Sequence, residues 1–387
     1  MTTAEAPTLL DPRTQNERDM LRLIRQERAL PKAEIAKRTG LSAQSATVII
    51  NKLEADGLVC RLPAIRGGVG QPKIPFGLNA QGAFSVGLKI GRRSYDMLLL
   101  DLSGHVRATL HENIAYPTVD SLLTFSQRAF ALLAQQLNEE GVSRIRGLGV
   151  AMPFEIWSWA EEAGASVEAL NAWRTVDIKQ ELENQLHLPV FVSNDATAAC
   201  GAEMAFGNSQ RLNNYMYMFV GTFLGGGLVI NGNLFTGKSG NAGAIGSLPF
   251  LAPHSTHGAE SSQLITQSSL YLLEKALTHK GENGLRIYDD TEHWPAYGEV
   301  LDNWIQQASL GLAHAAHCAF TLLDLDGVII EGAMPLKIKQ QLVEKTKTAL
   351  ANVDHRGVNF GGVKAGEVGS KAQSIGSANL PLIANYY

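Results

Sequence analysis

One order of strands and turns occurs twice in this sequence, and the repeat constrains the fold more than any other feature. Residues 84–114 predict a strand, a turn, a second strand, a tight turn at Gly104 and a third strand. Residues 215–237 predict the same series, with a glycine-rich first turn and a second turn at Gly232. Helical segments and further strands lie between the copies. We therefore expect an α/β body of two similar halves with a cleft between them.

Length and composition indicate more than one domain. The chain has 387 residues, 45% of them hydrophobic, which is too long for one ordinary core and apolar enough to fill several. A helical N-terminal part with a strand pair fills the first eighty residues, and the repeated body begins at Phe84. The expected division is a first domain at residues 1–80, a first α/β subdomain at 81–200 rejoined by 370–387, and a second α/β subdomain at 201–369.

Several function classes are excluded by the same composition. No apolar run approaches the ~20 residues that span a bilayer, and the first residues lack the basic start and apolar stretch of a secretory signal. We therefore expect a cytoplasmic protein. Cys60, Cys200 and Cys318 stand far apart in no metal-ligand spacing, so reduced thiols that pack as small apolar residues are expected.

The first eighty residues carry the pattern of a helix-turn-helix. An amphipathic helix is followed by a second, with Pro31 in its first turn and Gly40 as its cap. A third helix begins after Ser42 as N-cap and ends on Gly57. We expect its core face to consist of Val48, Ile49 and Leu53.

A strand, a glycine-rich tip and a returning strand follow this helix, which is the pattern of a wing. Residues 13–80 hold twelve Lys and Arg against six Asp and Glu, although the whole chain has a net charge of −4. A basic module on an acidic body suggests a polyanionic partner, and we favour double-stranded DNA over a helical cap or a protein-docking module. The third helix would place Ala43, Gln44, Ser45 and Thr47 at the base edges and Asn51 and Lys52 near phosphates, with Ser42 at its start and Arg66, Gln71 and Lys73 on the wing.

With this N-terminal part, four motifs of the body resemble the ROK family. They are "LDLSG" (100–104), "NDATAACGAE" (194–203), "GTFLGGGLVINGNLFTG" (221–237) and "NAGAIGSLPF" (241–250). The resemblance covers nearly the whole chain. It implies a winged helix-turn-helix followed by a duplicated actin-like, RNase H-like α/β body, a family that includes sugar kinases and sugar-responsive repressors.

The first glycine turn lacks the residues that the resemblance to the family's kinases implies for binding metal and phosphate. Lys89 stands where the resemblance implies an acidic residue, and Arg92 and Arg93 replace a Gly-Thr pair. A lysine cannot hold a cation, and long side chains fill space where backbone N–H groups would meet phosphate. We prefer a solvated turn here to an anion site. The second loop, residues 221–227, keeps the glycines and the geometry of a phosphate loop, but strand curvature and packing explain these glycines equally well.

The resemblance also implies a sugar site, which this chain keeps in part. Asn194 and Asp195 match the family's Asn-Asp pair, although Asp195 is also placed to cap the following helix. In the next motif Gly243 is kept, while Ala244 and Ser247 replace Glu and His. The expected effector-binding residues are Asn171, Trp173, Asn194, Asp195 and Gly243, and core packing is an open alternative for Trp173.

We expect no metal and no cofactor. The zinc motif of the family falls on residues 255–264, where Ser255, His257 and Ser262 occupy cysteine positions and Leu264 the glutamate position. Neutral serine is a poor zinc ligand, so one histidine cannot hold the ion.

The expected function is a sequence-specific DNA-binding transcriptional regulator rather than an enzyme. Such a protein would repress genes of sugar uptake or catabolism, answer to a sugar or sugar derivative, and act as a homodimer or homotetramer. One alternative is a ROK sugar kinase with an appended DNA-binding domain, with Asp195 as its base. Another is a regulator that binds no ligand.

Overall fold

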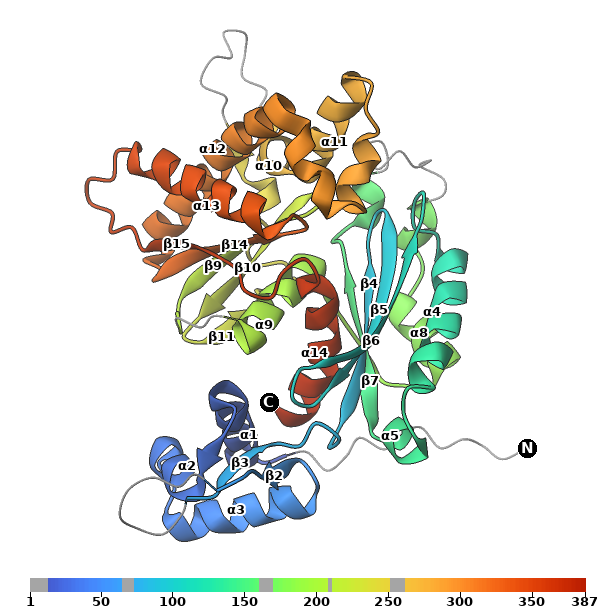
Figure 1. The fold of residues 1–387 in the computed structure, drawn as a ribbon, viewed down its shortest axis with the longest axis vertical. Coiled ribbons are helices and arrows are strands. Elements are labelled where there is room, and N and C mark those ends of the chain that lie inside the picture. The colour runs from blue at the N-terminus through green and yellow to red at the C-terminus, as the bar shows by residue number, and fades with distance from the viewer. Residues whose placement is uncertain (1–12, 65–72, 160–169, 208–210, 251–261) are drawn as a thin grey trace. The chain divides into compact units, whose positions relative to one another are not determined.

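The computed structural model describes residues 13–64, 73–159, 170–207, 211–250 and 262–387 (Figure 1). It divides into two compact units, Met1–Ser193 with Ser374–Tyr387, and Asn194–Gln373. Each unit is described by itself below.

The N-terminal part of the first unit has three helices and a small sheet. The helices are α1 (Gln15–Glu27), α2 (Lys32–Thr39) and α3 (Ala43–Ala55). The strands β1 (Leu30–Pro31), β2 (Val59–Arg61) and β3 (Pro75–Leu78) pair antiparallel in the order β1-β3-β2. Met20, Leu21, Ile24, Ile35 and Ile50 are fully buried between these elements. The predicted helix-turn-helix is thus present, and β2 and β3 are the two strands expected for the wing.

Two details of this part correct the sequence prediction. Val48 is not a core residue: its side chain points to solvent, and the buried face of α3 consists of Ala46, Ile50 and Leu53. Pro31 is the N-cap of α2 rather than a residue of its first turn. Val48 was misplaced because neighbouring positions of an apolar run differ little in hydrophobicity. Pro31 was misplaced because the first residue of a helix is uncertain by one or two positions.

A five-stranded sheet forms the body of the first unit. Its strands are β4 (Phe84–Ile90), β5 (Ser94–Asp101), β6 (Val106–Asn113), β7 (Ile145–Met152) and β8 (Val190–Asn194), in the order β6-β5-β4-β7-β8. β4, β5 and β6 form antiparallel hairpins, and β7 runs parallel to β4. Helices α4 (Val119–Ala134), α5 (Glu139–Ser143) and α8 (Ile178–Leu186) connect the later strands.

Helix α14 (Ala372–Tyr386) lies against this sheet in the first unit (Figure 1). Two glycines of the sheet permit the close approach. A Cβ atom at Gly87 would lie 2.5 Å from the backbone nitrogen of Ala378, and one at Gly149 would collide with the backbone oxygen of Ser377. Helix and sheet therefore meet backbone to backbone, a contact that a larger residue at either glycine would prevent.

The second unit repeats the same sheet order. Its strands are β9 (Tyr215–Val220), β10 (Leu224–Ile230), β11 (Asn233–Phe235), β14 (Gly327–Gly332) and β15 (Gly362–Ala365), in the order β11-β10-β9-β14-β15. β9, β10 and β11 are antiparallel, and β14 is parallel to β9. The predicted duplication of an α/β unit is thus confirmed at the level of strand order and direction.

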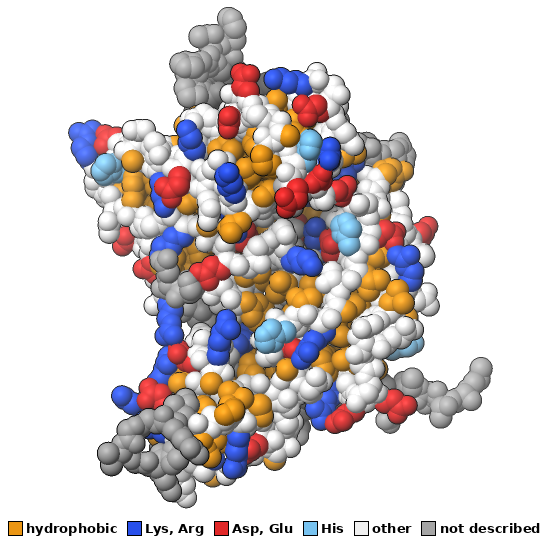
Figure 2. All heavy atoms as spheres, viewed as in Figure 1, with side chains coloured by type: hydrophobic (Ala, Val, Ile, Leu, Met, Phe, Trp, Pro, Cys, Tyr) orange, Lys and Arg blue, Asp and Glu red, His pale blue; other side chains and the backbone are white. Residues whose placement is uncertain are grey.

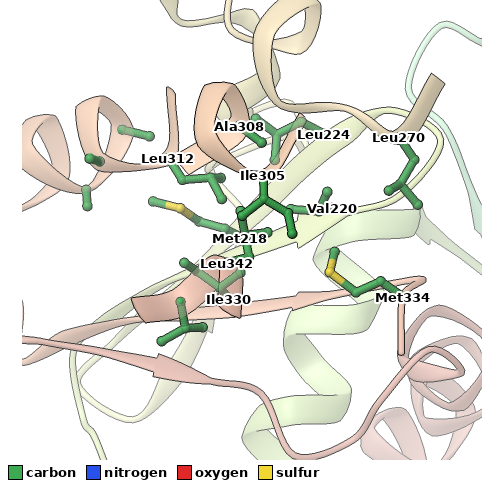
Figure 3. Packing of buried hydrophobic residues seen from close by; sticks show 14 of the residues in the cluster. Met218, Val220, Leu224, Leu270, Ile305, Ala308, Leu312, Ile330, Met334 and Leu342 are labelled. Atoms are coloured by element: carbon green, nitrogen blue, oxygen red, sulfur yellow. The ribbon is translucent and has the colours of Figure 1, made fainter. Parts of the chain in front are cut away.

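Both faces of this second sheet are covered. Along β9, Met216, Met218 and Val220 face a core built with α12 (Gly298–Leu323) and α13 (Leu336–Ala351) (Figure 3). Tyr215, Tyr217 and Phe219 face the other way, where they pack with residues of α9 (Asp195–Phe206) and with Ala372. Successive side chains of β9 point to opposite faces of the sheet. Because both faces are covered, every residue of the strand is buried, which explains why β9 is apolar throughout.

Short elements complete the described chain. They are β12 (Pro249–Phe250), β13 (Ser262–Gln263), α10 (Ile265–Ser268), α11 (Leu270–His279) and the 3-10 helices Ile156–Trp159, Ala172–Arg174, Ile245–Ser247, Gly284–Tyr288 and Thr291–Tyr297. None of the described helices combines the length and the apolar composition needed to cross a lipid bilayer.

Candidate DNA-binding and effector sites

The turn between α2 and α3 is closed by local interactions that the sequence predicted. Gly40 adopts the left-handed conformation, with φ of 69°, and its backbone N–H donates to the oxygen of Ala36. Ser42 caps α3, and its side chain accepts a hydrogen bond of 3.1 Å from the backbone of Ser45. These contacts fix the start of α3 in one orientation, as a helix that enters a DNA groove requires.

The residues predicted to face base edges lie at this fixed start. Ser42, Ala43, Gln44 and Ser45 are exposed. The hydroxyl groups of Ser42 and Ser45 are 2.9 Å apart, and the Thr47 hydroxyl donates to the Ala43 oxygen at 2.7 Å. The Gln44 amide has no hydrogen-bond partner among the described residues. Gln44 is therefore the polar side chain of this group that is ready to bind a base.

The two residues predicted to lie near phosphates already have partners within the protein. Lys32 donates to the Asn51 side-chain oxygen at 2.7 Å, and the Lys52 ammonium is 2.7 Å from the Glu17 carboxylate. Burial works to raise the pKa of Glu17, but Lys52 and the Thr14 cap outweigh it and lower that pKa below its ordinary value. Lys52 thus compensates the charge of the buried Glu17. If Lys52 also binds a phosphate, it does so in addition to this ion pair.

Most acidic side chains of this part are paired. Glu17, Asp19, Glu27, Glu54 and Asp56 form ion pairs with Lys52, Arg22, Arg38, Arg61 and Arg13. Figure 2 shows basic side chains interspersed with acidic and hydrophobic ones over the helix-turn-helix elements at the foot of the view. Lys37 and Lys73 are exposed cations without an ion pair in the described part of the chain. The wing residues Arg66 and Gln71 lie outside the described residues.

Lys89, expected in a solvated turn, lies in strand β4 and is paired within the sheet. Its ammonium lies 3.2 Å from Asp96, whose other oxygen is 2.6 Å from Nδ1 of His111. Burial works to raise the pKa of Asp96, but Lys89 and His111 lower it below its ordinary value. The turn itself is anchored by Arg93, which donates to the Ala115 oxygen at 2.9 Å. The expectation of a solvated turn was therefore wrong for Lys89.

The glycines of residues 221–227 are explained by packing. Gly225, Gly226 and Gly227 belong to strand β10 and not to a loop. A Cβ at Gly225 would lie 2.7 Å from the Ala196 Cβ, one at Gly226 2.6 Å from the Gly243 oxygen, and one at Gly227 2.6 Å from the Cys200 Cβ. Helix α9 and the Gly243 segment thus pack directly on the strand. Of the two explanations left open by the sequence, packing is the one with contacts to support it.

Asn194 and Asp195 lie where strand β8 ends and helix α9 begins. Asn194, not Asp195, is the N-cap: its side-chain oxygen accepts from the backbone of Ala196 and Thr197 at 3.0 and 3.2 Å. Asp195 is the first helical residue, and its Oδ2 accepts from the Gln373 side chain at 2.9 Å. The capping role that the sequence suggested for Asp195 therefore belongs to its neighbour. A carboxylate at a helix N-terminus can accept hydrogen bonds from ligand hydroxyl groups.

The other predicted effector residues differ in setting. Trp173 is a core residue, 3% exposed, and its indole N–H donates to the Pro117 oxygen at 3.0 Å. Asn171, two residues before it, is exposed. Gly243 has φ of 81° and packs on the backbone of Gly227. Asn171 and Trp173 belong to the first unit, and the remaining effector residues belong to the second. That all five residues bind one ligand therefore stays a prediction.

Sequence reasoning missed a buried ion pair at the end of β14. Glu331 accepts from the Lys339 ammonium at 2.6 Å and from the Gly369 backbone at 2.8 Å, and the same ammonium donates to the Gly366 oxygen at 2.7 Å. Both side chains are buried. A charged residue that ends the apolar strand "GVII" was the available signal. The pair ties α13 and the chain after β15 to the carboxyl end of β14.

The predicted absence of zinc falls largely outside the described residues. Of the motif positions, Ser262 and Leu264 are described. Ser262 donates to the backbone oxygen of Phe250 at 2.9 Å, and Leu264 is fully buried. The described part of the chain holds no cluster of three or more His, Cys, Asp or Glu side chains suited to a metal ion. The zinc prediction itself stays a prediction.

Known proteins are similar to this chain over its N-terminal part and its α/β body. The xylose repressor of Bacillus spizizenii is 24% identical over 294 residues, 74% of this chain and 71% of the repressor. A solved ROK family transcriptional regulator, a homolog of the E. coli MLC protein, has a TM-score of 0.67 at 21% identity over 96% of each chain. A ROK glucokinase from Streptomyces griseus, solved with glucose and AMPPNP, has a TM-score of 0.60 at 19% identity over 77% of this chain and 99% of its own. At such identities the two structures show a shared fold alone.

Two family models match the sequence. A winged helix-turn-helix DNA-binding model matches residues 13–59, which include α1 to α3. The ROK family model matches residues 85–382, more than half of the chain. This chain therefore belongs to the ROK family and carries a winged helix-turn-helix ahead of its ROK body.

Proposed function

We propose that the protein is a sequence-specific transcriptional repressor of genes for sugar uptake or catabolism. The observation that carries the proposal is the start of α3: it is fixed by Gly40 and Ser42 and presents Gln44 to solvent without a partner among the described residues. A capped, exposed helix start is the part of a helix-turn-helix that reads bases. Similarity to a xylose repressor over three quarters of the chain supports this role.

A sugar kinase is the second candidate, and one observation favours it. Asp195 keeps the position of the base in the kinases that the sequence resembles. Against it, Lys89 next to the first turn is paired with Asp96, and the glycines of β10 are packed against α9. A phosphate-binding loop needs backbone N–H groups open to the ligand. Our proposal therefore includes that the protein is not a kinase.

The effector of the repressor would be a sugar or sugar derivative. Asn171, Trp173, Asn194, Asp195 and Gly243 are the residues proposed to serve it. Among them, Asp195 offers a carboxylate at a helix N-terminus, next to the Asn194 cap. Sugar hydroxyl groups donate to carboxylates and accept from amides, so this pair has suitable chemistry. Control of DNA binding requires that the sugar bind one conformation of the protein more tightly than another.

Paired recognition of DNA follows from the proposed role. Repressors with a helix-turn-helix bind two half-sites about one helical turn apart, so two copies of α3 are needed. We propose a homodimer or a homotetramer.

The DNA-binding part of the proposal is tested on a duplex from the promoter region of the protein's own gene. Wild-type protein should bind with a steep dependence on salt, because Lys and Arg side chains displace counterions from phosphates. Replacing Gln44 and Ser45 together by alanine should weaken specific binding by 1–3 kcal/mol per lost base contact, about 5- to 150-fold each. The exposed Gln26 on α1 is a matched control, and Gln26→Ala should bind as the wild type. Unchanged affinity in the double variant would show that α3 does not read bases.

The effector part is tested by thermal shift with xylose, glucose, N-acetylglucosamine and their phosphates. A ligand present at a hundred times its Kd stabilises the native state by about 2.7 kcal/mol, which is a readily measured shift. Asp195→Asn should abolish the shift, whereas Asp302→Asn, at an exposed position of α12, should keep it. ATP-dependent phosphorylation of one of these sugars, lost in Asp195→Asn, would establish the kinase instead.

A further inference from the structure

The recognition helix presents an apolar side chain that the helix-turn-helix fold does not use. Val48 on α3 is 63% exposed, whereas Ala46, Ile50 and Leu53 on the same helix are buried. Among the described residues of the first eighty, Val48 and Ile74 are the exposed large hydrophobic side chains, and Ile74 is at the wing. A β-branched residue also lowers helix propensity relative to the common surface residues. Val48 therefore serves neither the core nor the stability of α3.

Its direction places Val48 at the centre of the face that would meet DNA. Successive helical residues are rotated by about 100°, so Val48 lies about 200° from Ala46 and thus opposite the buried face. Gln44 precedes it by one turn and Lys52 follows it by one turn along the same line. When the buried face of α3 packs on α1 and α2, the outward line of these three residues is the one turned toward a groove.

The polar neighbours of Val48 are bound within the protein. Ser45 pairs with Ser42, Thr47 bonds back to the Ala43 oxygen, and Asn51 accepts from Lys32. Lys52 is held by Glu17. These contacts leave Gln44 and Val48 as the side chains of the outward line that are ready for a base pair. A valine has no hydrogen-bonding group, so what it can recognise in the major groove is apolar.

The major groove offers one such group, the C5-methyl of thymine. We infer that Val48 contacts a thymine methyl and so specifies an A·T pair in each half-site, an inference that rests on the proposed function. Cytosine at the same position lacks the methyl and presents an amino group that the valine would desolvate without a partner. Val48 thus acts as a specificity-determining residue next to Gln44.

The inference is tested with DNA that differs by one methyl group. Wild-type protein is used to enrich duplexes from a library with a random core of about 20 bp, long enough for two half-sites. Each thymine of the enriched sequence is then replaced, one position at a time, by deoxyuridine. At one thymine per half-site the wild type should lose about three- to tenfold in affinity, because burying one methyl group contributes that much.

The variant Val48→Ala identifies the contact. It should bind the thymine and deoxyuridine duplexes with equal affinity at that position, while it keeps the wild-type response at all others. The substitution is at an exposed position and alanine favours helix, so folding is preserved, which circular dichroism checks. Val142→Ala, at an exposed valine of α5, is the matched control and should keep the full deoxyuridine penalty.

The outcomes separate this inference from the proposed function. If the wild type enriches no duplex, the proposed function fails and the inference fails with it. If it enriches a duplex that shows no thymine-specific penalty, or if Val48→Ala keeps the penalty in full, the DNA-binding function stands and the role of Val48 is refuted. Loss of the penalty in Val48→Ala but not in Val142→Ala supports the thymine contact.

Discussion

Lys89, Asp96 and His111 form a row across three neighbouring strands. Lys89 is opposite Asp96 in the β4–β5 ladder, and Asp96 is opposite His111 in the β5–β6 ladder. The sequence showed that Lys89 could not hold a metal ion, but it was interpreted as part of a solvated turn. Cross-strand partners follow from the register of the strands. The turn was placed correctly from the sequence but no register was assigned, so these pairs were missed.

This row makes the stability of the first unit depend on pH through His111. Burial works to lower the pKa of His111, but the bond to Asp96 outweighs it and raises the pKa above 6.5. A raised pKa in the folded state means that protonation stabilises folding. This contribution is complete below the pKa of the unfolded chain and is lost as pH rises through the folded pKa. Urea unfolding should therefore show wild type more stable than His111→Gln at about pH 5.5, with the difference shrinking toward about pH 8.5.

The matched control for His111 is His279, an exposed histidine at the end of α11. His279→Gln should follow the wild-type pH profile. A pH-independent difference between wild type and His111→Gln would contradict the assigned role of protonation, even if the variant were less stable.

Between elements, the second sheet depends on one buried ion pair. Lys339 of α13 and Glu331 at the end of β14 are both shielded from water, and each also binds backbone groups of the chain between β15 and α14. Removing one partner leaves an uncompensated buried charge. Lys339→Met should lower the free energy of unfolding by about 3–5 kcal/mol, measured by urea denaturation.

An exposed lysine on the same helix provides the comparison for this pair. Lys345→Met should change the stability by less than about 0.5 kcal/mol, because the side chain is in water in both states. Equal effects of the two substitutions would mean that Lys339 contributes to α13 itself rather than to the link with β14. Adding Glu331→Gln to Lys339→Met should recover part of the loss, since it removes the unpaired charge.

The elements show which features a sequence can predict. Gly40 and Ser42 were identified as caps because their interactions are within a few residues. The repeat predicted the three successive strands that begin each half, and the position of the later strands in each sheet was not predicted. Val48 was placed in the core in error, because the run of apolar residues around it gives no periodic contrast. The Asn194 cap was assigned one residue late, an uncertainty inherent to helix ends. Contacts between distant segments had no local signal at all.

At the scale of the whole molecule, α14 is such a distant partner for the DNA-binding part. Arg18 of α1 donates to the backbone oxygens of Ile383, Ala384 and Tyr387 at 2.9–3.2 Å, and so caps the last turn of α14. The guanidinium carbon of Arg25 lies 3.7 Å from the ring centroid of Tyr387. Burial raises the pKa of Tyr387 to about 12, so its hydroxyl stays protonated and donates to the Leu102 oxygen at 3.0 Å.

The opposite end of α14 is bonded to a proposed effector residue. Gln373, in its first turn, donates to the Asp195 carboxylate at 2.9 Å. Gln373 belongs to the second unit and Ser374 to the first, so this helix crosses the boundary between them. We propose that a ligand at Asp195 would influence α1 through α14, because this helix is bonded to Asp195 at its start and to Arg18 at its end. Arg18 is the contact to remove in order to test it.

Arg18→Gln should loosen α1 from α14, because three helix-terminal carbonyls lose a charged donor, each such bond contributing about 1.5–3 kcal/mol. Hydrogen exchange followed by mass spectrometry should show faster exchange in peptides from α1 and from the end of α14. Arg22→Gln is the matched control, since Arg22 lies one turn further along α1 and its ion pair is with Asp19 of the same helix. Unchanged exchange in Arg18→Gln would show that the capping bonds do not hold the two helices together.

If α14 is the route, Arg18→Gln should also keep the thermal shift with sugar while its affinity for DNA no longer changes when the sugar is added.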